Sequence, residues 1–88
     1  MTQTGLFDQP AYPPNPFKEG SQPYRVYHRL ERYGRVLNVE IMLGLGGPKI
    51  LKYTNRISEI REFLAPHGIS LRCERVHDGL FEYRIGRG

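Results

Sequence analysis

The chain has 88 residues, a formal net charge of +4 and an isoelectric point near 9.5. This length allows one small domain with little room for a deep substrate cavity, so a binding protein is favoured over an enzyme. Twelve basic residues stand against seven acidic ones after residue 22, and such an excess indicates a polyanionic partner. The single cysteine excludes an intrachain disulfide, and we find neither a signal peptide nor a run of eighteen apolar residues. We therefore expect a cytoplasmic protein with no membrane association.

The first segment of the chain differs in composition from the rest. Residues 1–23 contain five of the seven prolines and show neither helical nor alternating periodicity. Proline removes backbone donors and biases its neighbours toward extended conformations. We expect residues 1–20 to form a flexible, disordered arm, mobile or laid across the surface of a domain formed by residues 21–88.

A first helix is predicted over residues 22–33. Ser21 suits its N-cap and Gly34 its C-terminal end, and apolar residues recur between them at spacings of four and three. Residues 35–37 are too few for more than a short extended link. Asn38 then offers a second N-cap, and a short helix over 38–43 should end at the following glycine. The outer face of the first helix, with Arg25, Arg29 and Arg32, is expected to be mostly solvated, with flanking phosphate contact as the alternative.

The third helix has the clearest pattern. Pro48 suits its first position, and apolar residues at 50, 53, 57, 60 and 64 then fall on one stripe until Pro66 and Gly68 close the segment. A single helical rod from Lys49 to Leu64 would bury the isoleucines. It would also leave a basic N-terminal end open to solvent.

After the third helix the apolar period changes to two, which indicates two strands around "HDG". A three-residue loop at 77–79, with its glycine left-handed, would place Cys73 opposite Tyr83 and Leu71 opposite Ile85 on one buried face. Arg72 and Arg84 would then share the outer face, each diagonal to a glutamate of the other strand. The whole is an α+β, mainly α fold of three helices and a C-terminal two-stranded hairpin.

The stretch "GLGGPK", residues 44–49, suggests a phosphate-binding loop but lacks its chemistry. Such a loop follows a strand and needs a glycine directly before the lysine and a hydroxyl residue after it. Here a helix precedes, and Ile50 follows Lys49. The dinucleotide-binding glycine pattern fails as well, because Lys49 occupies its last glycine position. The stretch is interpreted as a turn between two helices, whose amides could meet a nucleic-acid phosphate.

The runs "GSQPYRVYHRLERYGRVLNVEIMLGLG", "NRISEIREFL", "HGISLRCERV" and "YRI" occur in this order over residues 20–85. They resemble the small winged helix-turn-helix DNA-binding proteins of bacteria, prophages and phages. The resemblance implies that the third helix is a recognition helix and that the hairpin is a wing. One departure is that residues 43–56 are longer than a minimal turn, so the third helix starts early or follows a longer loop.

The candidate DNA contacts fall into two groups. On the third helix, asparagine suits adenine, arginine suits guanine, and lysines near the helix start suit phosphates. In the hairpin, arginines could enter a minor groove or hold phosphate, although pairing with Glu74 and Glu82 is an alternative, as is a merely solvated helix face. Arg56 could also pair with a neighbouring glutamate, and Arg61 is assigned to a salt bridge or a carbonyl. The candidates are Lys49, Lys52, Asn55 and Arg56 on the helix and Arg72, Arg75 and Arg84 in the hairpin.

No catalytic, metal or cofactor site is predicted. The three histidines and Cys73 lack ligand spacing. Cys73 alternates with core residues and is expected to be unreactive. No acidic pair or activated nucleophile is apparent.

These observations predict a DNA-binding protein, monomeric or homodimeric, that inserts its third helix into the major groove of double-stranded DNA. It would act as a transcriptional regulator or as a replication or recombination accessory factor, with phage origin as one implication of the resemblance. The alternative is a protein-interaction adaptor or inhibitor on a winged-helix scaffold. The "QTGLF" of the arm resembles the peptides with which replication proteins dock on the bacterial sliding clamp, which implies partner contacts by Gln3, Leu6 and Phe7; otherwise this segment would cover apolar surface.

Overall fold

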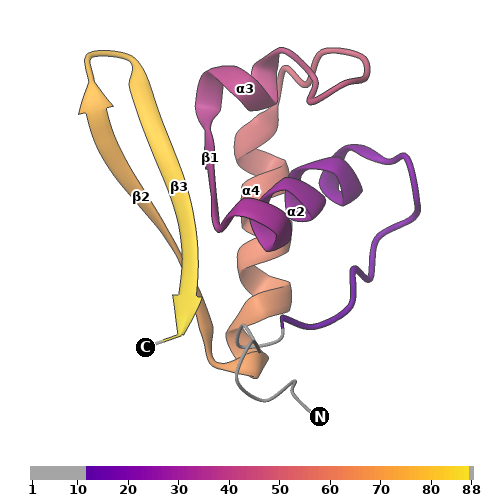
Figure 1. Ribbon diagram of the computed structural model, residues 1–88. Helices are drawn as coiled ribbons and strands as arrows, with labels where there is room; N and C mark the ends of the chain where they lie inside the picture. The colour runs from indigo at the N-terminus through magenta and orange to yellow at the C-terminus, as the bar shows by residue number, and fades with distance from the viewer. Residues whose placement is uncertain (1–11, 88) are drawn as a thin grey trace, which may run out of the picture.

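The computed structural model describes residues 12–87. They form three α-helices and a three-stranded antiparallel sheet, with the helices packed on one face of the sheet (Figure 1). The expected α+β class and the order of the elements are confirmed. The elements are α2 (Gln22–Tyr33), β1 (Arg35–Leu37), α3 (Asn38–Met42), α4 (Tyr53–Leu64), the 3-10 turn η1 (Ala65–His67), β2 (Ile69–His77) and β3 (Leu80–Arg87).

Helix α2 begins and ends where the sequence predicts. The Ser21 hydroxyl accepts a hydrogen bond from Tyr24 N at 3.3 Å. At the other end Gly34 is left-handed, with φ 79°, and its N–H donates to Leu30 O at 2.7 Å. The helix buries three side chains, Val26, Tyr27 and Leu30, at the centre of the core. Local capping and periodicity therefore determine this element.

The expected link at residues 35–37 is a strand, so the prediction of only two strands was wrong. Strand β1 pairs with β3, and the sheet order is β1-β3-β2. Val36 lies opposite Tyr83 and is buried. The Ile85 N–H also donates to Gly34 O at 3.1 Å, just before the strand. Burial of Val36 together with this backbone pairing stabilises a strand that is too short to form alone.

The register predicted for the hairpin is confirmed. Cys73 lies opposite Tyr83, Leu71 lies opposite Ile85, and Gly79 is left-handed with φ 75°. The loop differs, because only Asp78 and Gly79 form the turn and β2 continues to His77. A register irregularity between Arg75 and His77 accommodates the one residue of β2 between them that has no partner on β3.

Cys73 lies on the predicted face but is exposed, so the prediction that it is buried was wrong. Every residue of β2 after Leu71 is exposed, because the hairpin projects beyond the helices that cover its base. Tyr83, opposite Cys73, stays buried. Its pKa is raised above the usual tyrosine value by burial, with contributions from Cys73 and Tyr53.

Asn38 does not cap α3 as predicted, since Leu37 occupies the N-cap position. The Leu37 N–H donates to the Glu40 carboxylate at 2.8 Å, which supports the first turn. Asn38 is instead only 3 % exposed and joins α3 to the hairpin. Its Nδ2 donates to Gly79 O at 3.1 Å, and its Oδ1 accepts from Phe81 N at 2.9 Å. One buried amide thereby orients the hairpin relative to the helices.

Helix α4 begins at Tyr53, so the prediction of a rod from Lys49 was wrong. Ile50 is fully buried as expected, but its side chain comes from an irregular segment. The Ile50 N–H donates to Met42 O at 3.3 Å, which directs the chain away from a helical path. At Lys52 the backbone, with φ −104° and ψ 56°, is still outside the helical region.

The arm from Tyr12 onward lies against the domain. Phe17 packs edge-to-face on Tyr27 and Phe63, with ring centroids 6.3 and 6.0 Å apart. The Tyr27 hydroxyl donates to Pro13 O at 2.7 Å. Burial, and then the nearby Glu31 and Tyr12, raise the Tyr27 pKa to about 12. The proposed clamp peptide, with Gln3, Leu6 and Phe7, lies outside the described residues.

Within residues 12–87, no helix has the length and apolar character needed to cross a membrane.

Candidate nucleic-acid interface

Arg25 organises the loop that joins α3 to α4. Its Nη1 donates to Gly44 O at 2.6 Å and to Pro48 O at 3.2 Å. Gly47 lies against the guanidinium so closely that a Cβ there would overlap it. The expectation of a solvated Arg25 was therefore wrong. A residue of α2 determines the shape of a loop that begins nineteen positions later.

Two further contacts determine which loop residues face solvent. Gly44 has φ 100°, and a Cβ there would overlap the Gly47 carbonyl, so the turn needs glycine. Ile50 anchors the far side of the loop in the core. With these points held, Lys49 and Lys52 are both exposed, on either side of exposed Leu51.

The N-terminus of α4 is open and carries no acidic residue in its first turn. Lys52 occupies the N-cap, and no side chain caps the helix. The unpaired amides and the dipole at a helix start attract anions. Thr54 and Asn55 are exposed in the first turn. This end of the helix thus combines positive potential, two lysines and an amide side chain able to bind a base edge.

Most arginines of the domain are already paired. Arg29 contacts Glu40 at 3.3 Å, and Arg56 contacts Glu59 at 3.4 Å, the pairing left open from the sequence. Arg61 donates through Nε and Nη2 to Leu71 O at 3.3 Å, as expected of a carbonyl contact. In the hairpin, Arg75 pairs with Asp78 and Arg84 with Glu82. Within residues 12–86, the lysine and arginine side chains without a hydrogen bond, ion pair or ring contact are Lys18, Lys49, Lys52 and Arg72.

The structure divides the seven predicted DNA contacts into separate places. Lys49, Lys52 and Asn55 lie together at the start of α4, although only Asn55 is in the helix. Arg56 is half-buried in the next position, and its Nε has no partner. Arg75 lies on the projecting end of the hairpin. Arg72 and Arg84 lie on the outer face of the sheet, directly opposite each other.

Sequence reasoning missed Arg35. It lies directly opposite Arg84, on the edge strand β1. Nothing in residues 35–37 alone indicates that they pair with a strand almost fifty positions away. Only the order β1-β3-β2 brings this arginine to the outer face of the hairpin.

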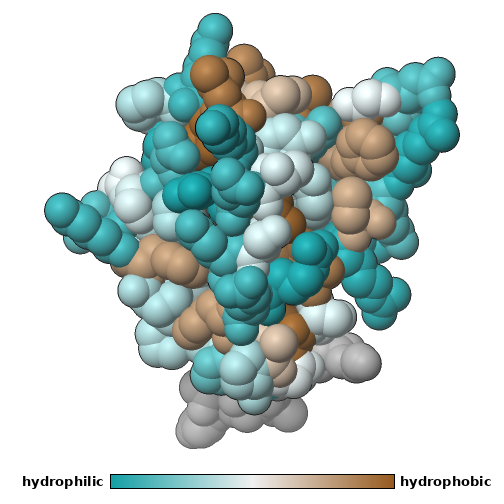
Figure 2. Space-filling model, turned by 180° about the vertical axis from the view of Figure 1, so that it is seen from behind, coloured by the Kyte–Doolittle hydropathy of each residue, from teal (hydrophilic) through white to brown (hydrophobic). Residues whose placement is uncertain are grey.

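Two exposed leucines lie at the same end of the molecule as the free lysines. Leu43 is 71 % exposed and Leu51 is 79 % exposed. The hydrogen bond from Ile50 N to Met42 O brings together the two segments that carry them. Hydrophobic atoms gather at this end, where α3 and the following loop lie (Figure 2). This end of the domain therefore combines two exposed leucines with two free lysines.

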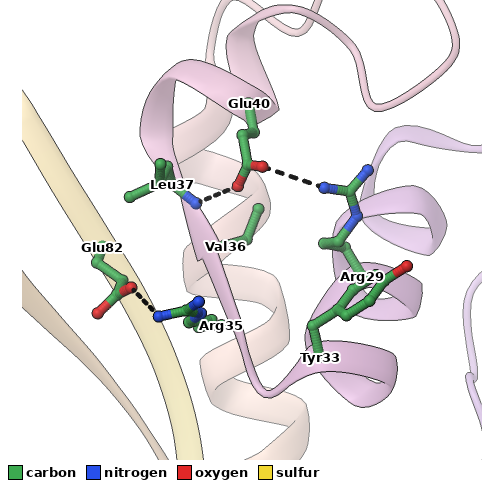
Figure 3. A pocket seen from close by; sticks show the side chains of 7 residues that line it. All are labelled: Arg29, Tyr33, Arg35, Val36, Leu37, Glu40 and Glu82. Atoms are coloured by element: carbon green, nitrogen blue, oxygen red, sulfur yellow. Dashed lines mark hydrogen bonds and ion pairs between the residues drawn. The ribbon is translucent and has the colours of Figure 1, made fainter.

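A pocket of about 340 Å³ lies between α2, β1 and α3, and its charges are balanced. Glu40 contacts Arg29, and Glu82 contacts Arg35 at 3.4 Å (Figure 3). The exposed ring of Tyr33 lies 5.5 Å from the Arg29 guanidinium. Because each guanidinium already pairs with a carboxylate, this pocket attracts an anion less strongly than the start of α4 does. The residues lining it are Arg29, Tyr33, Arg35, Val36, Leu37, Glu40 and Glu82.

The part of the chain that the structure describes contains no group of three His, Cys, Asp or Glu side chains able to hold a metal ion. No family model, curated protein or solved structure matches this chain. We therefore infer a function from the geometry of its own residues.

Proposed function

We propose that this chain is a winged helix-turn-helix protein that binds double-stranded DNA through the start of α4. The order helix, strand, helix, helix, hairpin, with β1 joined to the hairpin in a sheet of order β1-β3-β2, supports this assignment. In such a protein α3 and α4 form the helix-turn-helix and the β2–β3 hairpin forms the wing. A regulatory or accessory replication role is compatible with this geometry.

The observation that carries the proposal is the open, cationic start of α4. Lys49 and Lys52 are exposed and unpaired there, in a domain where most arginines have internal partners. Lysines in this position neutralise phosphates, and the helix dipole adds to their effect. Asn55 follows within one turn and can bind an adenine edge through paired hydrogen bonds.

The distribution of charge along α4 limits how the helix meets DNA. Its exposed second half carries Glu59 and Glu62, which a phosphate backbone would repel. Its exposed first half is free of acidic residues, and Thr54, Asn55 and Ser58 are exposed there. The helix therefore enters the groove by its N-terminal end, with its C-terminal half tilted away from the duplex.

The test is the affinity for a fluorescently labelled random-sequence duplex, measured by anisotropy. Lys49→Gln/Lys52→Gln should bind at least ~10-fold more weakly, because each lost phosphate contact removes favourable counterion release. Lys18→Gln/Arg32→Gln removes the same formal charge elsewhere and is the matched control. Equal losses in the two double variants would show that only net charge matters, and an absence of duplex binding by the wild type would refute the proposal.

The exposed leucines favour a second candidate, a protein-interaction module. Leu43 and Leu51 would supply apolar anchors, and the neighbouring lysines would favour an acidic partner. This candidate requires no nucleic acid. It predicts that Leu43→Ser/Leu51→Ser abolishes capture of a partner from nuclease-treated lysate, whereas the DNA-binding proposal predicts that this variant keeps most of its affinity for a duplex.

A further inference from the structure

Three arginines form a row across the outer face of the sheet. The register places Arg35 opposite Arg84 and Arg84 opposite Arg72, one residue from each strand. Directly opposite side chains on antiparallel strands have Cβ atoms about 5 Å apart, and like charges in this position are destabilising. A row of three cations is therefore costly for the fold unless anions neutralise it.

The domain neutralises this arginine row only in part. Glu82, in the next outward row, contacts Arg84 at 2.8 Å and Arg35 at 3.4 Å. Arg72 is exposed, and no carboxylate or carbonyl of the described residues contacts its side chain. Glu74, diagonal to Arg84, forms no ion pair within the described part of the chain. The arginine row thus keeps positive charge with a free guanidinium at one end.

The surface beside Arg72 is hollowed. A shallow pocket of about 190 Å³ is lined by Arg72, Glu74, Arg84, Ile85 and Gly86. Gly86 leaves open space, since a Cβ there would meet nothing within 4 Å. Guanidinium groups bind phosphate oxygens through pairs of parallel hydrogen bonds. The size of this hollow and the unpaired donors of Arg72 suit one phosphate of an extended backbone, although the Glu74 carboxylate lines the hollow too.

The arginine row faces away from α4. Alternate residues on the same strands, Val36, Leu71 and Tyr83, are buried against the helices. The arginines between them point to the opposite side of the sheet, which no helix covers in Figure 1. The arginine row is therefore a surface separate from the start of α4.

We propose that the arginine row binds the phosphate backbone of a second DNA segment, so that one molecule bridges two duplexes. This inference rests on the proposed function, because the first duplex is the one held at the start of α4. Two separate cationic surfaces on a small domain are what bridging by a monomer requires. A protein of this kind would draw distant DNA segments together.

The experiment is a capture assay with two duplexes. One random-sequence duplex is fixed to beads, protein is added, and retention of a second, fluorescent duplex is measured at low salt. Arg35→Gln/Arg72→Gln removes two members of the arginine row and leaves Arg84 paired with Glu82. Lys18→Gln/Arg32→Gln is again the charge-matched control, and anisotropy with a single duplex is measured for every variant.

The expected result is that the wild type and the control retain the second duplex. Arg35→Gln/Arg72→Gln should retain at least ~5-fold less of it than the wild type does. Its affinity for a single duplex should fall less than ~3-fold, because binding at the start of α4 remains. Unchanged capture by Arg35→Gln/Arg72→Gln would overturn the inference. So would an affinity loss for a single duplex as large as that of Lys49→Gln/Lys52→Gln, since the arginine row would then contact the first duplex. Failure of the proposed function is distinct, because no variant would then bind even one duplex.

Discussion

Replacing Asn38 with alanine should destabilise the fold through contacts that no other side chain can replace. The buried amide donates to Gly79 O and accepts from Phe81 N, so it joins the start of α3 to the hairpin turn. Each hydrogen bond contributes about 1 kcal/mol, and leaving the Gly79 carbonyl and the Phe81 amide without a partner in this partly buried region costs up to about 1–3 kcal/mol more. We therefore expect Asn38→Ala to lower the free energy of unfolding by about 2–4 kcal/mol. For a domain of this size that corresponds to a fall of roughly 10 °C or more in Tm.

The assay is urea unfolding followed by far-ultraviolet circular dichroism, with Asn55→Ala as the matched control. Asn55 is an exposed asparagine of α4 without a side-chain hydrogen bond among the described residues. Asn55→Ala should change stability by less than ~0.5 kcal/mol, yet it should weaken duplex binding. Asn38→Ala should behave in the opposite way at temperatures where it stays folded. Equal stability of the two variants would refute the role assigned to the buried amide.

Three further variants test the loop and the core. Arg25→Gln loses two carbonyl contacts and should cost about 2 kcal/mol in urea unfolding, and it should also weaken duplex binding; wild-type values for both would contradict the role of Arg25. Gly44→Ala combines positive φ with backbone overlap and should cost roughly 3 kcal/mol, against about 1 kcal/mol for Gly46→Ala, where φ is 90° but space is open; equal melting temperatures would contradict this. Burial raises the Tyr27 pKa from 10.0 to about 12 in the folded protein, so the contribution of the neutral hydroxyl to stability is complete below pH 10 and is lost as pH rises toward 12. Up to about 3 kcal/mol of the free energy of unfolding is at stake. In a pH-jump denaturation series, the free energy of unfolding of Tyr27→Phe should fall less steeply with pH over this window than that of the wild type. An unchanged slope would contradict the assignment.

Local signals predicted the elements that depend on local contacts. Ser21 and Gly34 mark the two ends of α2, because a hydroxyl and a left-handed glycine satisfy backbone groups there. The hairpin register followed from matching apolar faces, because a shift by one residue would expose Leu71 and Ile85. Neither conclusion needed knowledge of a distant residue.

The errors arose where a distant contact decides the conformation. Ile50 has the spacing of a helical apolar stripe, and it is buried, but Arg25 and the Met42 carbonyl hold it in a loop. Strand β1 is too short to be recognised without β3 beside it. Alternation placed Cys73 on the correct side of the hairpin, yet it gave no measure of how far the helices extend along that side.

The sequence predicted which residues make up the candidate site, but it did not predict how they are arranged. Lys49, Lys52 and Asn55 do lie together, because the glycine-rich loop and the start of α4 are adjacent in the chain. The hairpin arginines were identified, but their separation from α4 depends on the orientation of the sheet. Arg35 joins them only through pairing across the sheet.

The salt dependence of duplex binding at fixed pH tests whether the lysines at the start of α4 hold DNA phosphates. The slope of log affinity against log salt is negative, and its magnitude decreases by about 0.9 for each phosphate contact with B-form DNA that is removed. We predict a steep slope for the wild type and one reduced by about 1.8 for Lys49→Gln/Lys52→Gln, with the Lys18→Gln/Arg32→Gln control close to the wild type. A flat response of the wild type, or the same slope in all three proteins, would contradict the account.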